Sequence, residues 1–185
     1  MQRATANDNQ CDATRGLLRG LIRPRRFDHV GIEVRDAEKS LAFYRDVLGF
    51  EQIRRPPFTC RGYWLVLGDS LQLHIAEAAA SRHADLKRQR ADRMDFKGIV
   101  EHGVANHFAF CVDGVAEARD RLARHNKTAS ADSIVPFHFI DRSHLTDADQ
   151  LFVLDPDDNL IELASQVNRT YLAPMFRRTK LPSRL

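Results

Sequence analysis

The stretch from Phe27 to Phe50, FDHVGIEVRDAEKSLAFYRDVLGF, decides the fold. Its first part, up to Val34, alternates apolar and polar side chains, which is typical of a strand buried on one face. Asp36 is a residue type that caps the start of a helix, and apolar side chains then recur about every 3.6 residues. Gly49 is the residue type that most often ends a helix. The stretch therefore predicts a strand followed directly by an amphipathic helix.

The residues after Gly49 predict three further strands. These strands lie at 50–54, 62–67 and 71–76, and Gly68 with Asp69 forms the turn between the last two. Alternating β-branched, aromatic and aliphatic side chains between turn residues are the signal for such strands. Residues 26–77 are therefore expected to form a first module with the element order βαβββ.

A second copy of this pattern begins near Asn106. The segment HFAFCV, which starts at His107, corresponds to HVGIEV, which starts at His29, and an amphipathic helix is predicted over 115–125. Further strands are predicted near 134–140, at 150–154 and, after the turn residues 155–159, at 160–165. A repeat of this kind indicates two copies of one unit, each too small to bury its sheet alone. We expect an α+β fold in which two βαβββ modules share a core and leave a central cleft between their sheets.

The remaining residues are expected to be appended to these two modules. The predicted parts are an N-terminal arm at 1–25, module 1 at 26–77, a charged connector at 78–104, module 2 at 105–166 and a C-terminal tail at 167–185. Long connectors in compact proteins are usually functional or disordered. Because the connector joins the strands that carry the candidate ligands, we expect it to be a partly helical cover over the cleft. Its basic residues favour an anionic substrate.

Composition argues against several classes of function. The 28 Lys and Arg residues nearly balance the 25 Asp and Glu residues, and the formal net charge is +3, which gives no support to nucleic-acid binding. No stretch approaches the roughly 18 apolar residues that cross a bilayer. The three cysteines have no CxxC spacing, which argues against a disulfide framework, and the first residues lack the apolar segment of a secretory signal. We therefore expect a cytoplasmic protein with no membrane or nucleic-acid partner.

Four polar residues occupy corresponding places in the two copies. His29 and His107 open the first strands, and Gln72 and Glu162 lie on the last strands. A pseudo-twofold relation between the modules would bring these four side chains to one point on the concave face. Two imidazoles, one carboxylate and one amide oxygen suit a divalent transition metal. The sequence therefore predicts a metal site made of these four residues.

Two further residues are candidates for the same cleft. His74 lies two positions after Gln72, so it shares that strand face at a separation of about 6.6 Å. Repeat equivalence favours Gln72 as the ligand, whereas the affinity of imidazole for transition metals favours His74. If Gln72 binds the metal, His74 is expected to bind the substrate, and Gln150 is a second candidate for that role. Five aromatic side chains are expected in the core rather than in a substrate pocket: Tyr63, Trp64, Phe108, Phe110 and Phe152.

The chain resembles the vicinal oxygen chelate superfamily, which includes glyoxalase I, methylmalonyl-CoA epimerase, fosfomycin-resistance transferases, bleomycin-resistance proteins and extradiol dioxygenases. The resemblance rests on FDHVGIEVRDAEKSLAFYRDVLGF, NHFAFCVDGVAEARDRL and DQLFVLDPDDNLIEL, which cover most of residues 27–165. It implies two βαβββ modules packed as a half-barrel around a divalent metal ion (Fe, Ni, Co, Zn or Mn). Within that resemblance, His29, His107 and Glu162 match recurrent metal ligands.

Two positions depart from the pattern of these relatives. Asp158 stands where many of them have glycine, and aspartate tolerates the left-handed backbone that such a turn requires. Gln72 stands where glyoxalase I has a carboxylate. The epimerase resembles this chain in having glutamine at that position. A neutral amide cannot accept a proton, so Glu162 is the catalytic base expected among the ligands.

Three functions are consistent with these residues. The first is a metal-dependent lyase or isomerase that acts on a small substrate whose vicinal oxygens chelate the metal. The second is an iron(II) extradiol-type dioxygenase that uses His29, His107 and Glu162 as a two-histidine, one-carboxylate triad. The third is a metal-free protein of the bleomycin-resistance type that binds a small molecule.

A homodimer is expected from apolar segments outside the repeat. The segments at 14–22 and 171–176 would expose hydrophobic surface if they were left free, so they are expected to pack on a neighbouring chain. The resemblance is consistent with this expectation, because two modules can close their cleft within one chain or by exchange between two chains.

Overall fold

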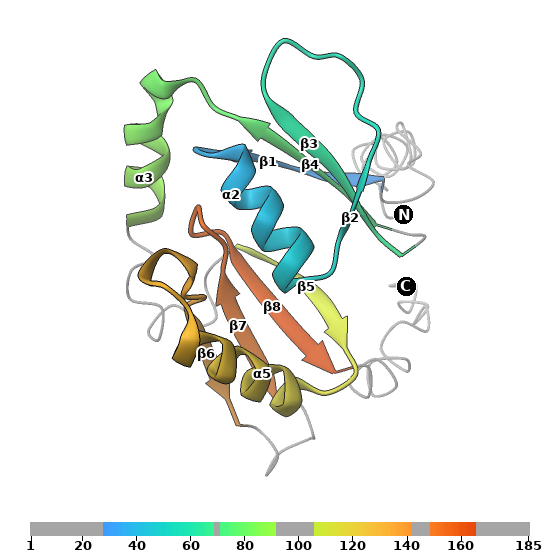
Figure 1. The fold of residues 1–185 in the computed structure, drawn as a ribbon, viewed down its shortest axis with the longest axis vertical. Coiled ribbons are helices and arrows are strands. Elements are labelled where there is room, and N and C mark those ends of the chain that lie inside the picture. Colours follow the sequence, from blue (N-terminus) through green and yellow to red (C-terminus); the bar gives the residue numbers. More distant parts are fainter. Residues whose placement is uncertain (1–27, 69–70, 92–105, 142–148, 166–185) are drawn as a thin grey trace, which may run out of the picture.

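Two four-stranded sheets form the framework of the protein in the computed structural model (Figure 1). The structure describes residues 28–68, 71–91, 106–141 and 149–165. The predicted N-terminal arm, the C-terminal tail and the connector from residue 92 onward lie outside the described residues. The two apolar segments behind the predicted homodimer lie outside them as well.

Module 1 has the predicted βαβββ order. Its sheet has the strand order β1-β4-β3-β2, in which β1 runs parallel to β4 and the other neighbours are antiparallel. A helical connection after β1 allows this strand to run parallel to its neighbour, whereas the hairpins between the other strands make those pairs antiparallel. The elements are β1 (His29–Val34), α2 (Ala37–Ala42), the π-helical turn η1 (Phe43–Val47), β2 (Glu51–Ile53), β3 (Gly62–Leu67) and β4 (Leu71–Glu77).

Module 2 repeats this topology. Its sheet has the order β5-β8-β7-β6, again with the first and last strands parallel. The elements are β5 (His107–Val112), α5 (Val115–Thr128), the 3-10 turn η3 (Ala131–Ser133), β6 (Phe137–Ile140), β7 (Gln150–Leu154) and β8 (Leu160–Ser165). The α+β fold of two βαβββ modules is therefore confirmed. Between the modules, η2 (Ala80–Arg82) and α3 (His83–Ala91) form the described part of the connector.

The ends of the first helix follow the local signals in the sequence. The Asp36 side chain accepts hydrogen bonds from the backbone N–H groups of Glu38 and Lys39, at 3.0 and 3.1 Å. Gly49 has φ +77°, the left-handed conformation that glycine adopts without steric cost. Between these ends the helix changes from α to π at Phe43, a change that the apolar spacing alone did not predict.

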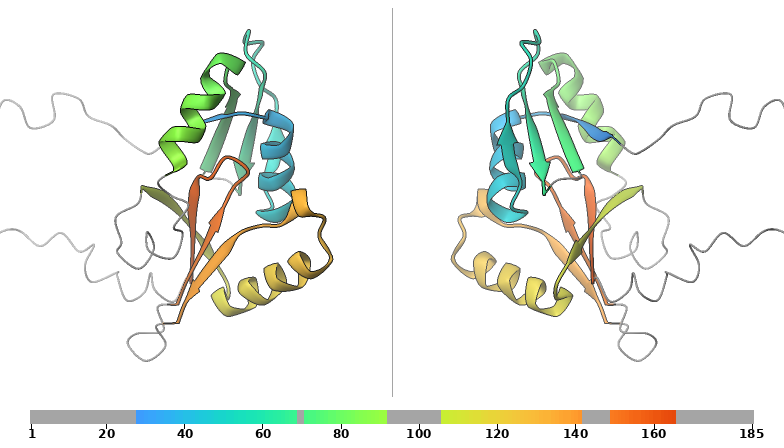
Figure 2. Two further views of the ribbon diagram at one scale, coloured as in Figure 1. Left: turned by 90° about the vertical axis from the view of Figure 1, so that its left-hand side faces the viewer. Right: turned by 90° about the vertical axis from the view of Figure 1, so that its right-hand side faces the viewer.

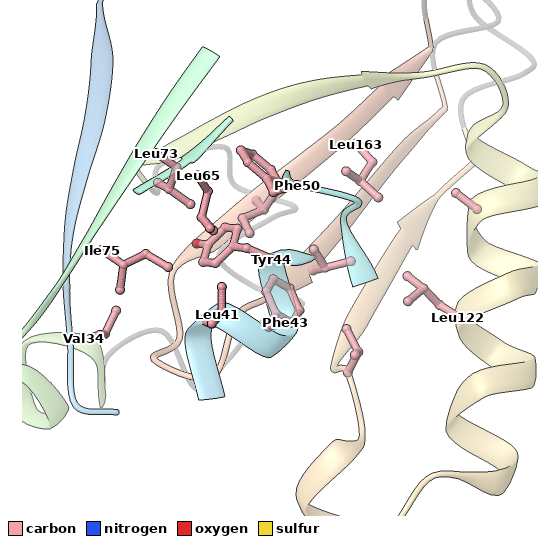
Figure 3. Packing of buried hydrophobic residues seen from close by; sticks show 14 of the residues in the cluster. Val34, Leu41, Phe43, Tyr44, Phe50, Leu65, Leu73, Ile75, Leu122 and Leu163 are labelled. Carbon is pink, nitrogen blue, oxygen red and sulfur yellow. The ribbon is translucent and has the colours of Figure 1, made fainter. Parts of the chain in front are cut away.

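One hydrophobic core joins the two modules. It combines residues of module 1, such as Tyr44 and Phe50, with residues of module 2, such as Leu122 and Leu163, all of them buried (Figure 3). The rings of Phe50 and Phe110 meet edge to face, with centroids 5.6 Å apart. Burying aliphatic and aromatic area in this way is the main stabilising contribution to the fold.

Polar contacts between the modules converge on the turn that precedes β8. The hydroxyl of Tyr44 donates to Oδ2 of Asp155 at 2.9 Å. Arg35 donates from its backbone N–H and from Nε to Oδ1 of Asp157, at 3.0 and 2.8 Å. Asp158, in the same turn, has φ +63°, so the expected left-handed conformation at this position is confirmed.

Helices α2 and α5 lie on the same side of the two sheets. Figure 2 shows α2 beside the sheet of module 1 and α5 beside the sheet of module 2, on one common side. The aliphatic face of each sheet packs toward that side, so the polar strand residues lie on the side away from α2 and α5. No helix among the described residues is long and apolar enough to cross a membrane.

Candidate metal centre

The strands alternate between a face that packs into the core and a face that carries the candidate ligands. On β4, Leu73 and Ile75 are buried in the core, and successive strand residues point to opposite faces. Gln72 and His74 therefore lie on the other face of the sheet. On β8, Glu162 likewise stands between two buried core residues, so its side chain also lies on the face of its sheet that does not pack into the core.

Half-site 1 consists of His29, Gln72 and His74. Nδ1 of His29 lies 3.0 Å from a carboxylate oxygen of Asp28. A carboxylate on one ring nitrogen orients a histidine and leaves the other nitrogen as the donor to a metal. The rings of His29 and His74 are stacked, with centroids 4.1 Å apart and planes 18° apart, and Nε2 of His74 lies 3.3 Å from Oε1 of Gln72. The three candidate ligands of module 1 are therefore brought together.

The surroundings of His74 favour an uncharged ring. Burial lowers the pKa of its imidazole, and the nearby His29 lowers it further. Only a neutral imidazole has the free lone pair that a metal ion needs. The lowered pKa therefore favours the neutral form of His74, which is the form that can bind a metal ion.

Half-site 2 consists of His107 and Glu162. Nε2 of His107 lies 3.0 Å from Oε2 of Glu162, and Nε2 of Gln150 donates to Oε1 of the same carboxylate at 2.7 Å. The side chain of Glu162 is only 13% exposed. The ring of His107 also packs edge-on against Phe152, with centroids 5.8 Å apart. Gln150, predicted to bind substrate, therefore lies where it fixes the orientation of Glu162.

The strand register identifies which donors of the two modules correspond. In each module, one donor on the last strand pairs with the residue two places after the histidine that opens the first strand. In module 1 this donor is His74, which pairs with Gly31. In module 2 it is Glu162, which pairs with Ala109. His74 and Glu162 therefore occupy equivalent positions in the fold.

Gln72 occupies a different position. It pairs with His29 itself, and the residue in that place in module 2 is Leu160, which pairs with His107. The register therefore does not show the equivalence of Gln72 and Glu162 that the sequence comparison predicted. Gln72 stays a candidate ligand because it lies within half-site 1.

The two half-sites do not meet within one chain. Across the described ranges, no three His, Cys, Asp or Glu side chains come together as a possible metal site. The modules are joined through the core faces of their sheets, whereas the half-sites lie on the opposite faces. The packing that connects the modules therefore does not bring the half-sites together.

Chemically, the two half-sites fit the same kind of ion. Together they offer the imidazoles of His29, His74 and His107 and the carboxylate of Glu162. Three nitrogen donors and one carboxylate suit Zn, Ni, Co, Fe(II) or Mn, whereas calcium and magnesium prefer oxygen donors.

Trp64 is the site residue that the sequence analysis missed. It was expected in the core with four other aromatic residues, but its ring stacks on His74 with centroids 4.0 Å apart and planes 2° apart. The other four pack against or within the two hydrophobic clusters, as expected: Tyr63, Phe108, Phe110 and Phe152. The sequence could have indicated this position, because Trp64 directly precedes the core residue Leu65 on β3. Side chains alternate along a strand, so Trp64 lies on the face of the sheet opposite to the core.

The comparisons with known proteins agree with this fold. The sequence model described as Glyoxalase/Bleomycin resistance protein/Dioxygenase superfamily matches residues 26–163. No curated protein matches the chain. The trypanothione-dependent glyoxalase I of Leishmania major superposes with a TM-score of 0.56 and 22% identity, over 82% of this chain and 94% of that chain. The fosfomycin resistance protein FosX of Listeria monocytogenes gives 0.53 and 18%, over 77% and 93%. At these identities the likeness to solved structures shows a shared fold.

Proposed function

Because the chain belongs to the Glyoxalase/Bleomycin resistance protein/Dioxygenase superfamily, we propose that it is a metal-dependent lyase or isomerase acting on a small substrate with vicinal oxygens. The observation that carries the proposal is the presence of a half-site at the same register position of each module. His29, His74, His107 and Glu162 would hold the ion. Gln72 is the alternative to His74.

A second copy of the chain would complete the metal site in this proposal. In this proposal the partner packs on the side of the sheets away from α2 and α5, which is where the strand alternation places the half-sites. In a twofold dimer, half-site 1 of one protomer meets half-site 2 of its partner, and the symmetry generates two identical centres. A homodimer is therefore required in this proposal, because each metal centre takes one half-site from each protomer.

Glu162 would move the proton in the reaction. When bound, the metal would polarise the substrate oxygens and so make the adjacent C–H group more acidic. Among the candidate ligands, Glu162 is the carboxylate that can take this proton and return it. Gln150 holds one of its oxygens by a 2.7 Å hydrogen bond, and the low exposure of the side chain limits competition from water.

Mixing two inactive variants tests the shared site. His29→Ala removes a ligand of half-site 1, and His107→Ala removes a ligand of half-site 2. If the centre lies between protomers, a mixed dimer has one intact centre and one that lacks both ligands. Random re-association of equal amounts should then restore about one quarter of the wild-type centres. The measurement is bound metal per chain after unfolding, mixing, refolding and reloading with Zn²⁺.

Three outcomes separate the possibilities. Each variant alone should bind little metal, while His125→Ala, a histidine on α5 outside both half-sites, should bind as much as the wild type. Full stoichiometry in His29→Ala or His107→Ala would show that the proposed ligands are wrong. Loss in both variants without recovery on mixing would place the centre within one chain. Substrate-dependent uptake of oxygen by the loaded protein would indicate the dioxygenase instead.

A further inference from the structure

A pocket lies between the two modules on the core side of their sheets. Its volume is about 480 Å³, and small-molecule sites usually measure about 300–1,000 Å³. Both modules line it, among other residues with Val47 of η1, Leu122 of α5 and Leu163 of β8. Leu122 and Leu163 are labelled in Figure 3. The pocket therefore has the size and the concave shape of a ligand site.

This pocket is separate from the two half-sites. Val153 and Leu163, which line it, belong to the main hydrophobic core. Glu162 precedes Leu163 on β8, so its side chain points to the opposite face of the same sheet. The sheet of module 2 thus lies between the pocket and half-site 2, and a ligand in the pocket would not contact the proposed metal ion.

The inside of the pocket is apolar and incompletely covered. Five of the side chains that line it pack against the main core but are only partly buried: Val47, Leu48, Leu67, Phe110 and Val112. Apolar area that stays accessible around one concave site is typical of a binding site. The inside of the pocket is therefore suited to the hydrocarbon part of a ligand.

The π-helical turn η1 contributes the part of the pocket that belongs to module 1. The N–H group of Leu48 donates to the carbonyl oxygen of Phe43, five residues earlier, at 3.3 Å. Asp46, Val47 and Leu48, at the end of this wide turn, all line the pocket. Turns of this kind are rare and frequently occur at functional sites. The π turn is thus a second observation, independent of the volume, that points to a ligand.

The rim of the pocket carries one firmly paired anion and one weakly paired cation. The carboxylate of Asp46 accepts two hydrogen bonds from Arg45, at 2.6 and 2.8 Å, and this bidentate pairing matches its charge. Arg121 donates to the exposed Glu117 at 2.7 Å, through one of its nitrogens. An exposed ion pair of this kind contributes little free energy, so Arg121 can pair with another carboxylate at small cost.

We propose that this pocket is a second binding site, which takes a small apolar carboxylate of the fatty-acid type. The alkyl chain would lie among the partly buried apolar side chains, and the carboxylate would accept hydrogen bonds from Arg121 at the rim. Because residues of both modules line the pocket, the bound acid would contact both modules. The inference does not depend on the metal centre, so either proposal can fail without the other.

Two amphiphiles with the same alkyl chain provide the test. Decanoate carries an anionic head, and decyltrimethylammonium carries a cationic one. Isothermal titration of the full chain at low salt, below the micelle concentrations of both compounds, should give a dissociation constant about three- to tenfold lower for decanoate. The preference should shrink as sodium chloride is added, because salt screens exposed charges.

A matched pair of variants tests the role of Arg121. Arg121→Gln removes the cation at the rim and should abolish the preference for decanoate over decyltrimethylammonium. Arg124→Gln makes the same change at another exposed arginine of α5, which is not among the residues that line the pocket. This control should keep the full preference.

Two further variants fill the pocket from different modules. Val47→Phe adds a ring on the side of η1, and Ala118→Phe adds one on the side of α5. Each should weaken the binding of decanoate at least about fivefold, because the added ring takes the space of the alkyl chain. Far-UV circular dichroism shows which of the two is folded, and one folded variant is sufficient for the test.

The outcomes either support or overturn the second site. Absence of decanoate binding to the wild type would overturn it. Equal affinity for the two amphiphiles, or a preference that persists in Arg121→Gln, would overturn the assigned ligand class. Unchanged binding of decanoate to a folded pocket-filling variant would place the acid elsewhere on the protein and would also overturn the inference.

Discussion

His74 and Glu162 occupy equivalent positions in the two modules but have different chemical surroundings. Glu162 has a hydrogen-bonding partner on each carboxylate oxygen, His107 on one and Gln150 on the other. His74 instead lies between two rings, and burial lowers the pKa of its imidazole. One module therefore offers a proton acceptor, and the other offers a neutral ligand held flat against aromatic neighbours.

A comparison of His74→Ala with Gln72→Ala identifies the fourth ligand. Loss of a residue that only orients a ligand typically weakens metal affinity about 10–100-fold, so loss of the ligand itself should exceed about 100-fold. We expect His74→Ala to fall in the larger class and Gln72→Ala in the smaller one, because the register makes His74 the counterpart of Glu162. Competition with a chromophoric chelator measures both affinities. A larger loss in Gln72→Ala would assign the amide as the ligand.

At the scale of elements, the turn before β8 is the part of module 2 that makes hydrogen bonds to module 1. The carboxylate of Asp155 accepts hydrogen bonds from the hydroxyl of Tyr44 and from the backbone N–H groups of Asp157 and Asn159, at 2.8–2.9 Å. The carboxylate is almost completely buried. Burial raises its pKa, and the hydrogen bonds of Asn159 and Tyr44 oppose the shift only in part.

The raised pKa of Asp155 predicts how stability varies with pH. A carboxyl group whose pKa is higher in the folded state binds protons more tightly there than in the unfolded chain. Its stabilising contribution is therefore complete below the ordinary aspartate pKa of about 4 and is lost as the pH rises through the folded-state value. The free energy of unfolding in urea, measured across this range, should decline with rising pH more steeply in the wild type than in Asp155→Asn.

An exposed aspartate provides the control for this profile. Asp132→Asn, in η3, changes the same residue type on the surface, and its profile should follow that of the wild type. A difference between wild type and Asp155→Asn that grows in favour of the wild type as the pH rises would contradict the assigned direction.

At the scale of the whole molecule, the continuous core makes the two modules depend on each other. Leu151, on β7 of module 2, belongs to the same buried cluster as Leu73 on β4 of module 1. Neither sheet can cover its aliphatic face fully without the residues that the other module supplies. The described modules should therefore unfold together rather than one after the other.

Leu151→Ala tests this dependence through a probe in the other module. Truncating a fully buried leucine should lower the free energy of unfolding by about 2–5 kcal/mol. Trp64 reports on module 1 alone, because it is the single tryptophan, whereas far-UV circular dichroism reports on both modules. The midpoints from both probes should coincide and move together to lower urea concentration. A Trp64 transition that stays at the wild-type midpoint would show that the modules unfold independently.

The local elements were predictable because neighbouring residues specify them. The strand at 29–34, the Asp36 cap, the end at Gly49 and the left-handed Asp158 all follow from spacing and residue type within a few positions. The repeat of two modules was predictable for the same reason, because each copy carries the same local signals. Candidate ligands could be named because polar residues interrupt otherwise apolar strands.

Which residue on the last strand of module 1 corresponds to which residue on the last strand of module 2 was decided only by the tertiary structure. Side chains alternate with a period of two along a strand, so shifting one repeat by two residues against the other preserves the apolar pattern. The sequence therefore cannot distinguish the match of Gln72 to Glu162 from the match of His74 to Glu162. Hydrogen bonding to β1 and β5, strands far away in the sequence, selects the second match.

The sequence by itself thus determined the elements, their order, the repeat and the list of polar candidates, since these depend on contacts within or between nearby turns of chain. The tertiary structure alone decided three features: the equivalence of His74 and Glu162, the separation of the half-sites within one chain, and the stacking of Trp64 on His74. All three depend on how distant strands align and which face of each sheet packs into the core. That alignment is set by hydrophobic burial across the whole molecule, which no local pattern encodes.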